Sequence, residues 1–146
     1  MIRVPTPHLE TIRAQAESAY PRECCGVLLG VVRGDDGAER REVVRPVPLG
    51  NAWEGAQERR YLIPAETMLV LEREALRERL EIIGAYHSHP DHPAVPSTFD
   101  REHAWPWYVY LIIPVEGGQA GALRAWRLAD DRSAFREEAM QIKEES

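Results

Sequence analysis

The sequence predicts a single α/β domain with a mixed central β-sheet, two main helices and a short third helix. Three observations predict this fold class. The chain has 146 residues, which is the ordinary size of one domain with its own core. Hydrophobic residues make up 44% of the chain and charged residues 29%, as in globular proteins. Helix-like and strand-like patterns alternate along the chain, which is typical of an α/β domain.

The first half of the chain predicts one helix and two antiparallel strands. The helix is expected over residues 7–19, because a Thr-Pro pair forms a helix start and apolar residues then fall on one face. An apolar run over 24–32 predicts a strand, and residues 34–37 are a strong turn signal. Residues 39–49 alternate between apolar and polar, so we expect them to pair with the first strand across this turn.

The second half of the chain predicts the longer helix and most of the sheet. Its helical pattern places leucines near the helical period and charged residues on the opposite face. A near-continuous apolar strand that follows later is expected at the centre of the sheet. In chain order we expect a loop over 50–60, a short strand over 61–63, a helix over 64–81, a strand over 82–89, a stiff proline-rich loop over 90–96, a short helix over 97–103, strands over 107–115 and 121–128, and an edge strand over 134–142.

Charge and cysteine content exclude several classes of function. The net charge of -6 argues against a nucleic-acid or anionic-membrane binder. No stretch of about 18 apolar residues is present, so we expect no membrane span. The two cysteines, Cys24 and Cys25, are adjacent, which excludes a disulfide framework and a thiolate zinc site. Reduced cysteines and the lack of a secretory signal predict a cytoplasmic location.

Two histidines and an aspartate form the strongest candidate site. His87 and His89 occupy alternate positions of a strand and therefore point to the same face of the sheet. The proline-rich loop returns the chain so that Asp100, at the start of the next helix, lies close to them. Two imidazoles and one carboxylate suit Zn²⁺, with water as the fourth ligand. A zinc site with one open position is typical of catalysis.

Two further residues are candidates for the chemistry around this metal. Glu23 directly precedes a buried strand, where a charged residue needs a reason, and it could take a proton from the water and pass it on. The alternatives are an ion pair with Arg22 or a role in capping. Ser97 could donate a hydrogen bond to the developing oxyanion. Ser97 could also be the N-cap of the helix that carries Asp100, and the two roles are compatible.

These residues together resemble the JAMM (MPN-plus) metallopeptidase motif. Glu23 stands before an apolar glycine-containing strand, and a His-Ser-His-Pro sequence over 87–90 is followed by Ser97 and Asp100 at the family's spacing. The resemblance covers nearly the whole chain and implies one MPN-like (cytidine-deaminase-like) catalytic domain over 1–146. It also implies zinc on His87, His89 and Asp100, with Glu23 as general base and acid and Ser97 supporting the tetrahedral intermediate.

The family resemblance also implies a class of substrate. Such enzymes are zinc-dependent amide or isopeptide hydrolases that cleave after the C-terminal Gly-Gly tail of ubiquitin-like proteins. The short loops of this chain resemble the small prokaryotic members, which act on sulfur-carrier proteins of the ThiS/MoaD type or on ubiquitin-like modifiers. The alternative is a non-catalytic MPN-type protein-binding scaffold. The sequence predicts no particular oligomeric state.

Other reactive side chains have plainer explanations. His92 is expected in solvent and His103 at the edge of the site. Cys24 and Cys25 are expected to be small buried residues of a core strand, although one of them must face the site. A zinc deaminase or a zincin protease would need His-x-Glu with Pro-Cys-x-x-Cys, or His-Glu-x-x-His, and the sequence contains neither set. Four aromatic residues are expected to pack in the core and at the sheet edge, and some of them could line a groove for a peptide tail: Trp105, Trp107, Tyr108 and Tyr110.

Overall fold

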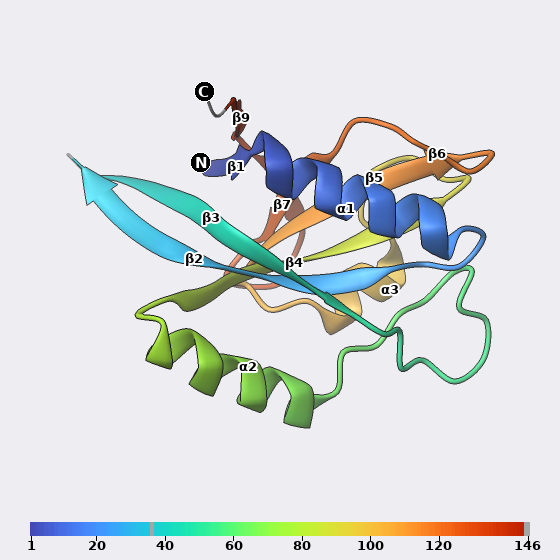
Figure 1. Ribbon diagram of the computed structural model, residues 1–146, viewed down its shortest axis with the longest axis horizontal. Coiled ribbons are helices and arrows are strands. Elements are labelled where there is room, and N and C mark those ends of the chain that lie inside the picture. The colour runs from blue at the N-terminus through green and yellow to red at the C-terminus, as the bar shows by residue number, and fades with distance from the viewer. Residues whose placement is uncertain (36, 145–146) are drawn as a thin grey trace.

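A computed structural model describes residues 1–35 and 37–144, and in these residues nine strands and three helices form one sheet with helices on both faces (Figure 1). The α/β fold class is confirmed, with the two main helices and the short third helix. The elements are β1 (Ile2–Pro5), α1 (Thr6–Ala19), β2 (Cys25–Asp35), β3 (Ala38–Leu49), α2 (Ala65–Arg77), β4 (Glu81–Pro90), α3 (Thr98–His103), β5 (Val109–Glu116), β6 (Gln119–Ala120), β7 (Arg124–Leu128), β8 (Phe135–Glu138) and β9 (Met140–Lys143).

The sheet is mixed and has the strand order β8-β7-β5-β4-β2-β3-β1-β9, with β6 paired to β5. As expected, β2 and β3 pair in antiparallel fashion, while Asp36 of the predicted turn lies outside the described residues. The apolar strand β5 lies inside the sheet, parallel to β4 and antiparallel to β7. The site strand β4 is therefore held on both sides, by β2 and by β5.

Helices cover the two faces of the sheet in separate apolar clusters. Helix α1 packs on one face through Ile12 and Ala16, and α2 packs on the other through Leu71 and Ala75 (Figure 1). Each helix is amphipathic, so packing of its apolar face against the sheet supplies most of its stability. No helix in the described part of the chain is both long enough and apolar enough to cross a membrane.

Two predicted boundaries around α2 are wrong. Residues 61–63 were expected as a strand, but they form an irregular segment. The N–H of Leu62 donates to the side chain of Asn51 at 3.1 Å, and the ring of Tyr61 is turned toward the site. Apolar content alone cannot distinguish such a segment from a strand. The helix ends at Arg77, four residues earlier than expected, because the chain turns through Arg79 with a φ of 60°.

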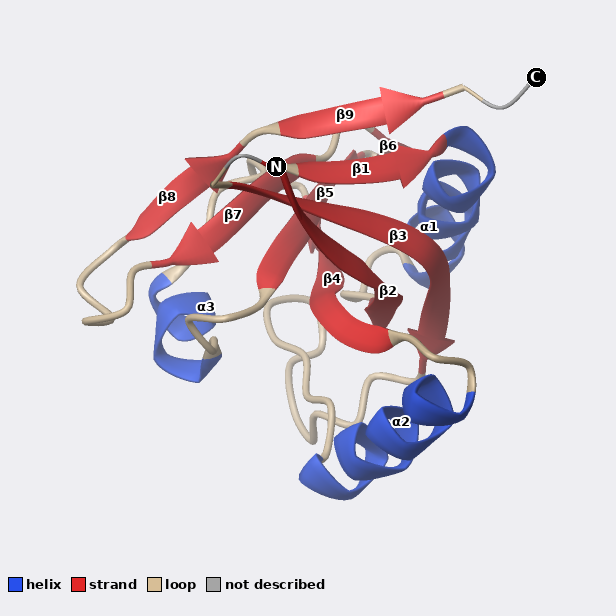
Figure 2. Ribbon diagram, turned by 90° about the vertical axis from the view of Figure 1, so that its left-hand side faces the viewer, coloured by secondary structure: helices blue, strands red, loops and turns tan. Residues whose placement is uncertain are grey.

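The C-terminal segment forms two strands rather than one edge strand. Strands β8 and β9 are separated only by Ala139, yet they lie at opposite ends of the sheet order. Strand β9 pairs with β1, a short N-terminal strand that the sequence patterns did not predict. The N–H of Ile2 donates to the carbonyl of Ala139 at 2.9 Å. The strongly curved sheet thus brings its two ends together, and one segment runs from one end to the other (Figure 2).

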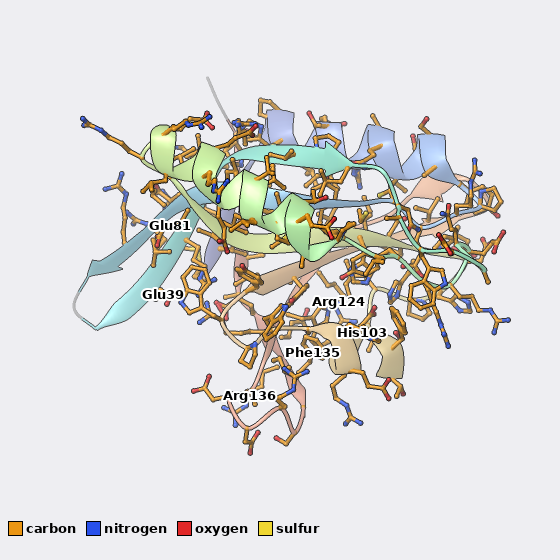
Figure 3. All side chains as sticks on the ribbon, turned by 90° about the horizontal axis from the view of Figure 1, so that it is seen from below. Glu39, Glu81, His103, Arg124, Phe135 and Arg136 are labelled. Carbon is orange, nitrogen blue, oxygen red and sulfur yellow. The ribbon has the colours of Figure 1, made fainter. Side chains whose placement is uncertain are left out.

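A buried arginine anchors the start of β4, opposite the end that carries the histidines. Arg41 is fully buried and donates to the carbonyl of Ile83 and to Glu39, both at 2.7 Å. Its guanidinium lies 4.2 Å from the ring centroid of Trp107. Glu39, labelled in Figure 3, also accepts from Arg127 at 2.6 Å. Burial by itself would raise the pKa of Glu39, but its two arginine partners outweigh this effect and lower that pKa to about 2.

Candidate active site

The end of β4 carries two buried imidazoles on one face. His87 and His89 are 1% and 6% exposed, and their Nε2 atoms lie 3.1 Å apart. The intervening Ser88 faces the other way, and its Oγ accepts a hydrogen bond from the N–H of Cys24 at 2.8 Å. The strand period therefore brings the two histidines together, as predicted, and leaves Ser88 to a structural hydrogen bond on the opposite face.

Asp100 reaches the same point from α3. Its carboxylate oxygens lie 3.2 Å from His87 Nε2 and 3.0 Å from His89 Nε2. The proline-rich segment returns the chain to the strand, and Ala94 in that segment accepts from the indole N–H of Trp126 at 2.9 Å. Burial by itself would raise the pKa of Asp100, but the charges and hydrogen bonds of the two imidazoles outweigh it and lower that pKa.

The three residues fit a small divalent cation. In the part of the chain that the structure describes, they are the one group of histidine, cysteine and acidic side chains whose ligand atoms converge, all within 4.8 Å. Their separations of 3.0–3.2 Å approach the edge of about 3.3 Å in a tetrahedron with bonds of about 2.0–2.1 Å. The Nδ1 atom of His89 lies 2.8 Å from the carbonyl of Pro93 and must donate to it, which leaves Nε2 free as a ligand.

Glu23 is buried beside this group, and one of its carboxylate oxygens makes no hydrogen bond to the described residues. The residue is 5% exposed, and its Oε1 makes no hydrogen bond within residues 1–35 and 37–144. An ion pair with Arg22 is not among the salt bridges of these residues. Burial and then the negative charge of Asp100 raise the pKa of Glu23 to about 9. A buried unpaired carboxyl is costly, which is the pattern expected of a functional acid or base.

Ser97 is the N-cap of α3 and keeps its hydroxyl proton available. Its Oγ accepts from the N–H of Asp100 at 3.0 Å, and its own N–H donates to Asp100 Oδ2 at 2.9 Å. These two bonds form a capping box. Among the described residues the hydroxyl accepts a hydrogen bond and donates none, so its O–H is able to donate to a substrate oxygen. The capping role is therefore present, and it is compatible with the catalytic one.

The remaining reactive side chains take no part in the converging group. His92 is exposed, and His103 lies on α3, where it stacks on Phe99 with ring centroids 4.0 Å apart (Figure 3). Both cysteines are buried free thiols, and burial raises the pKa of each, to about 12 for Cys25. Of the four aromatic residues expected in the core and at the sheet edge, Tyr110 is buried in the core, whereas Trp105 and Trp107 are 66% and 47% exposed and are not core residues.

Two site residues escaped the sequence patterns. The ring of Tyr61 stacks on His87, with centroids 4.5 Å apart and planes inclined by 21°. The side chain of Asn51 donates to the backbone carbonyl of Glu23 at 3.2 Å. Both residues lie between β3 and α2, where the sequence predicts only a loop and a short strand. An asparagine directly after a glycine is a turn signal, and it carries no sign of contact with a distant glutamate.

Comparison with known proteins places the chain in a family. Residues 5–129 match the family described as prokaryotic homologs of the JAB domain, and this range contains all five motif residues. A desampylase from Haloferax volcanii is 38% identical over 111 residues, which are 75% of this chain and 74% of that protein. A probable TtuB-protein conjugate cleaving protease from Thermus thermophilus is 34% identical over 121 residues, which are 82% of this chain and 74% of that protein.

A solved structure agrees in fold over the whole length. A protein from Desulfitobacterium hafniense, determined in solution, matches with a TM-score of 0.82 and 30% identity, covering 99% of this chain and 94% of that one. The predicted family resemblance and the expected domain fold are both confirmed by these matches. On the family match and the motif at the end of β4, the chain belongs to the prokaryotic homologues of the JAB domain.

Proposed function

We propose that this chain is a zinc-dependent peptidase that cleaves the amide bond after the C-terminal Gly-Gly tail of a ubiquitin-like or sulfur-carrier protein of the ThiS/MoaD type. The convergence of His87, His89 and Asp100 carries the proposal, since a set of three such donors is typical of a zinc site whose fourth ligand is water. The conjugate-cleaving relative supports the reaction class and the ubiquitin-like partner. We further propose that it acts in the cytoplasm.

The residues around the donors have complementary roles. What zinc supplies at such a site is a lowered pKa for a water ligand and polarisation of the scissile carbonyl. Glu23 accepts the proton of the attacking water and delivers it to the leaving amine. Its raised pKa of about 9 suits the second step, and a bound cation favours the carboxylate needed for the first. Ser97 donates its hydroxyl proton to the oxygen of the tetrahedral intermediate.

The burial of Glu23 favours an enzyme over a scaffold. A protein that only binds partners gains nothing from an unpaired buried carboxyl, whose desolvation costs free energy. Exchange for glutamine would then be neutral or stabilising in a scaffold. In an enzyme the same exchange abolishes proton transfer, while the metal donors remain in place.

The test uses a sulfur-carrier protein extended beyond its Gly-Gly terminus by a short peptide. We expect the zinc-loaded protein to release the peptide, as measured by intact mass, and a chelator to stop the release. Glu23→Gln should retain one zinc per chain and lower kcat by about 10²–10⁴-fold. Glu102→Gln, an exposed acid-to-amide exchange on α3, is the matched control and should keep full activity. Full activity of Glu23→Gln, or zinc binding and substrate binding with no cleavage by the wild type, would contradict the proposal.

A further inference from the structure

The segment between β3 and α2, residues 50–64, is organised by one side chain, that of Asn51. Its Oδ1 accepts two hydrogen bonds and its Nδ2 donates two, at distances of 3.0–3.2 Å. The partners are the N–H groups of Trp53 and Leu62 and the carbonyls of Glu23 and Arg60. Four bonds use the whole hydrogen-bonding capacity of a primary amide. Asn51 therefore ties the two ends of the segment to each other and to Glu23.

Glu23 is held in place through its backbone. Its N–H donates to the carbonyl of Gln57 at 2.7 Å, and its carbonyl accepts from Asn51 at 3.2 Å. Both partners belong to the 50–64 segment, and Gln57 is itself tied back by bonds from its Nε2 to the carbonyls of Asn51 and Trp53. Oε1 of Glu23 makes no hydrogen bond within the described residues, so the bonds to its backbone are the polar contacts that fix where the side chain begins.

The same segment also contacts a metal donor. Asn51 binds the backbone of Arg60 and of Leu62, and Tyr61 lies between these two residues. The ring of Tyr61 stacks on His87. The side chain of Asn51 thus connects the backbone of Glu23 to the backbone on both sides of Tyr61, which packs against His87. The relative position of these two groups is what an attack on a carbonyl depends on, since a displacement of about 1 Å costs about 10²-fold in rate.

We infer that Asn51 is a positioning residue that sets the carboxyl group of Glu23 relative to the metal donors. The inference rests on the proposed function for its catalytic part. An aspartate at this position would have almost the same shape but could not donate, and it would turn a carboxylate toward the carbonyls of Glu23 and Arg60. Asn51→Asp is therefore the sharpest variant, and Asn51→Ala is the second, which removes the bonds without adding charge.

The first measurement is hydrogen exchange on the metal-free protein. In both variants the amide of Glu23 should exchange at least about tenfold faster than in the wild type, because its hydrogen bond to the segment opens more often. The amide of His87, within the sheet, should be unchanged. Glu54→Gln, an exposed exchange in the same segment, is the control and should leave both amides unchanged. Unchanged exchange at Glu23 would overturn the inference, whether or not the protein is an enzyme.

The second measurement is a double-mutant cycle on the extended substrate. In the wild-type background Asn51→Asp should lower kcat by about 10²-fold, with KM and zinc content nearly unchanged. In the Glu23→Gln background it should lower the residual kcat by less than about threefold, because Asn51 acts through a carboxyl that is no longer there. Equal losses in both backgrounds would show a general structural role and refute the positioning role. A wild type that never cleaves would instead refute the proposed function.

Discussion

Substitution of Ser97 separates its capping role from the chemical role proposed for it. The hydroxyl of Ser97 accepts from the N–H of Asp100 at 3.0 Å, and its proton is free for a substrate oxygen. Alanine removes both functions. Glycine removes the hydroxyl but remains a good N-cap, because the exposed helix end can then be solvated. Threonine keeps both functions, and the extended backbone at Ser97, with φ of -83° and ψ of 171°, suits it.

The capping role predicts a loss of stability, and the proposed chemical role predicts a loss of kcat. Loss of the cap in Ser97→Ala should cost about 1 kcal/mol of unfolding free energy, or about 3–4 °C in Tm for a chain of this size. Ser97→Gly should cost only a few tenths of a kcal/mol. Loss of the donor should lower kcat by about 10²–10³-fold in both variants. Ser97→Thr should remain close to the wild type in both properties.

The assay combines thermal unfolding, zinc content and cleavage of the extended sulfur-carrier protein. Zinc content is required because the capping box also orients Asp100, and all variants keep the backbone bond of 2.9 Å to its Oδ2. The reasoning predicts equal activity losses for alanine and glycine despite unequal stabilities. An activity that follows stability across the series, with glycine nearly as active as serine, would refute a chemical role for the hydroxyl.

Three further predictions concern stability and reactivity. The pKa of Glu39 is lowered from 4.5 to about 2, so the stability that its charge contributes is present above pH 4.5 and is lost as the pH falls toward 2. The difference in unfolding free energy between the wild type and Glu39→Gln should therefore shrink over that range. Gly26→Ala should lower the unfolding free energy by about 1–3 kcal/mol in urea titrations, because a methyl group there would overlap the buried ring of Tyr86, whereas Gly50→Ala, with open space around it, should have little effect. Iodoacetamide at pH 8 should leave the mass and the cleavage rate of the folded protein unchanged, since Cys25 is buried with its pKa raised to about 12, and modification of the folded protein would contradict that burial.

The convergence of the three candidate metal ligands could be predicted because they are close along the chain. His87 and His89 are brought together by the period of one strand, and Asp100 by a loop and a single helix turn. Glu23 lies more than 60 residues before His87 in the chain, so only its place before a buried strand and the family motif indicate that it belongs to the same site. Asn51 and Tyr61 could not be predicted, because their roles depend on a backbone carbonyl and an imidazole that only the folded chain brings to them.

The fold shows the same division between local and distant signals. Helical patterns and turn residues predict α1, α2 and the β2–β3 pair. The apolar face predicted for α2 is wrong in part, because Leu69 and Leu76 are exposed and Leu71 and Ala75 pack on the sheet instead. Strand β1 has only four residues and is stabilised by pairing with β3 and β9, far away in sequence. The division of the last segment at Ala139 depends on how the sheet curves. The residue pattern of 135–143 alone therefore does not predict that the segment divides into β8 and β9.

Residues 135–143 form the outermost strand at both ends of the sheet order, so the exposure of the two ends is linked. Strand β8 protects β7 and strand β9 protects β1, and both protecting strands are four residues long and joined through one residue. Detachment of this segment in a local fluctuation would uncover the backbone of two strands at once rather than one. Uncovered strand edges invite pairing with other chains. We therefore expect the C-terminal segment to protect both edges from aggregation, and cleavage within it to lower solubility more than its few buried residues would suggest.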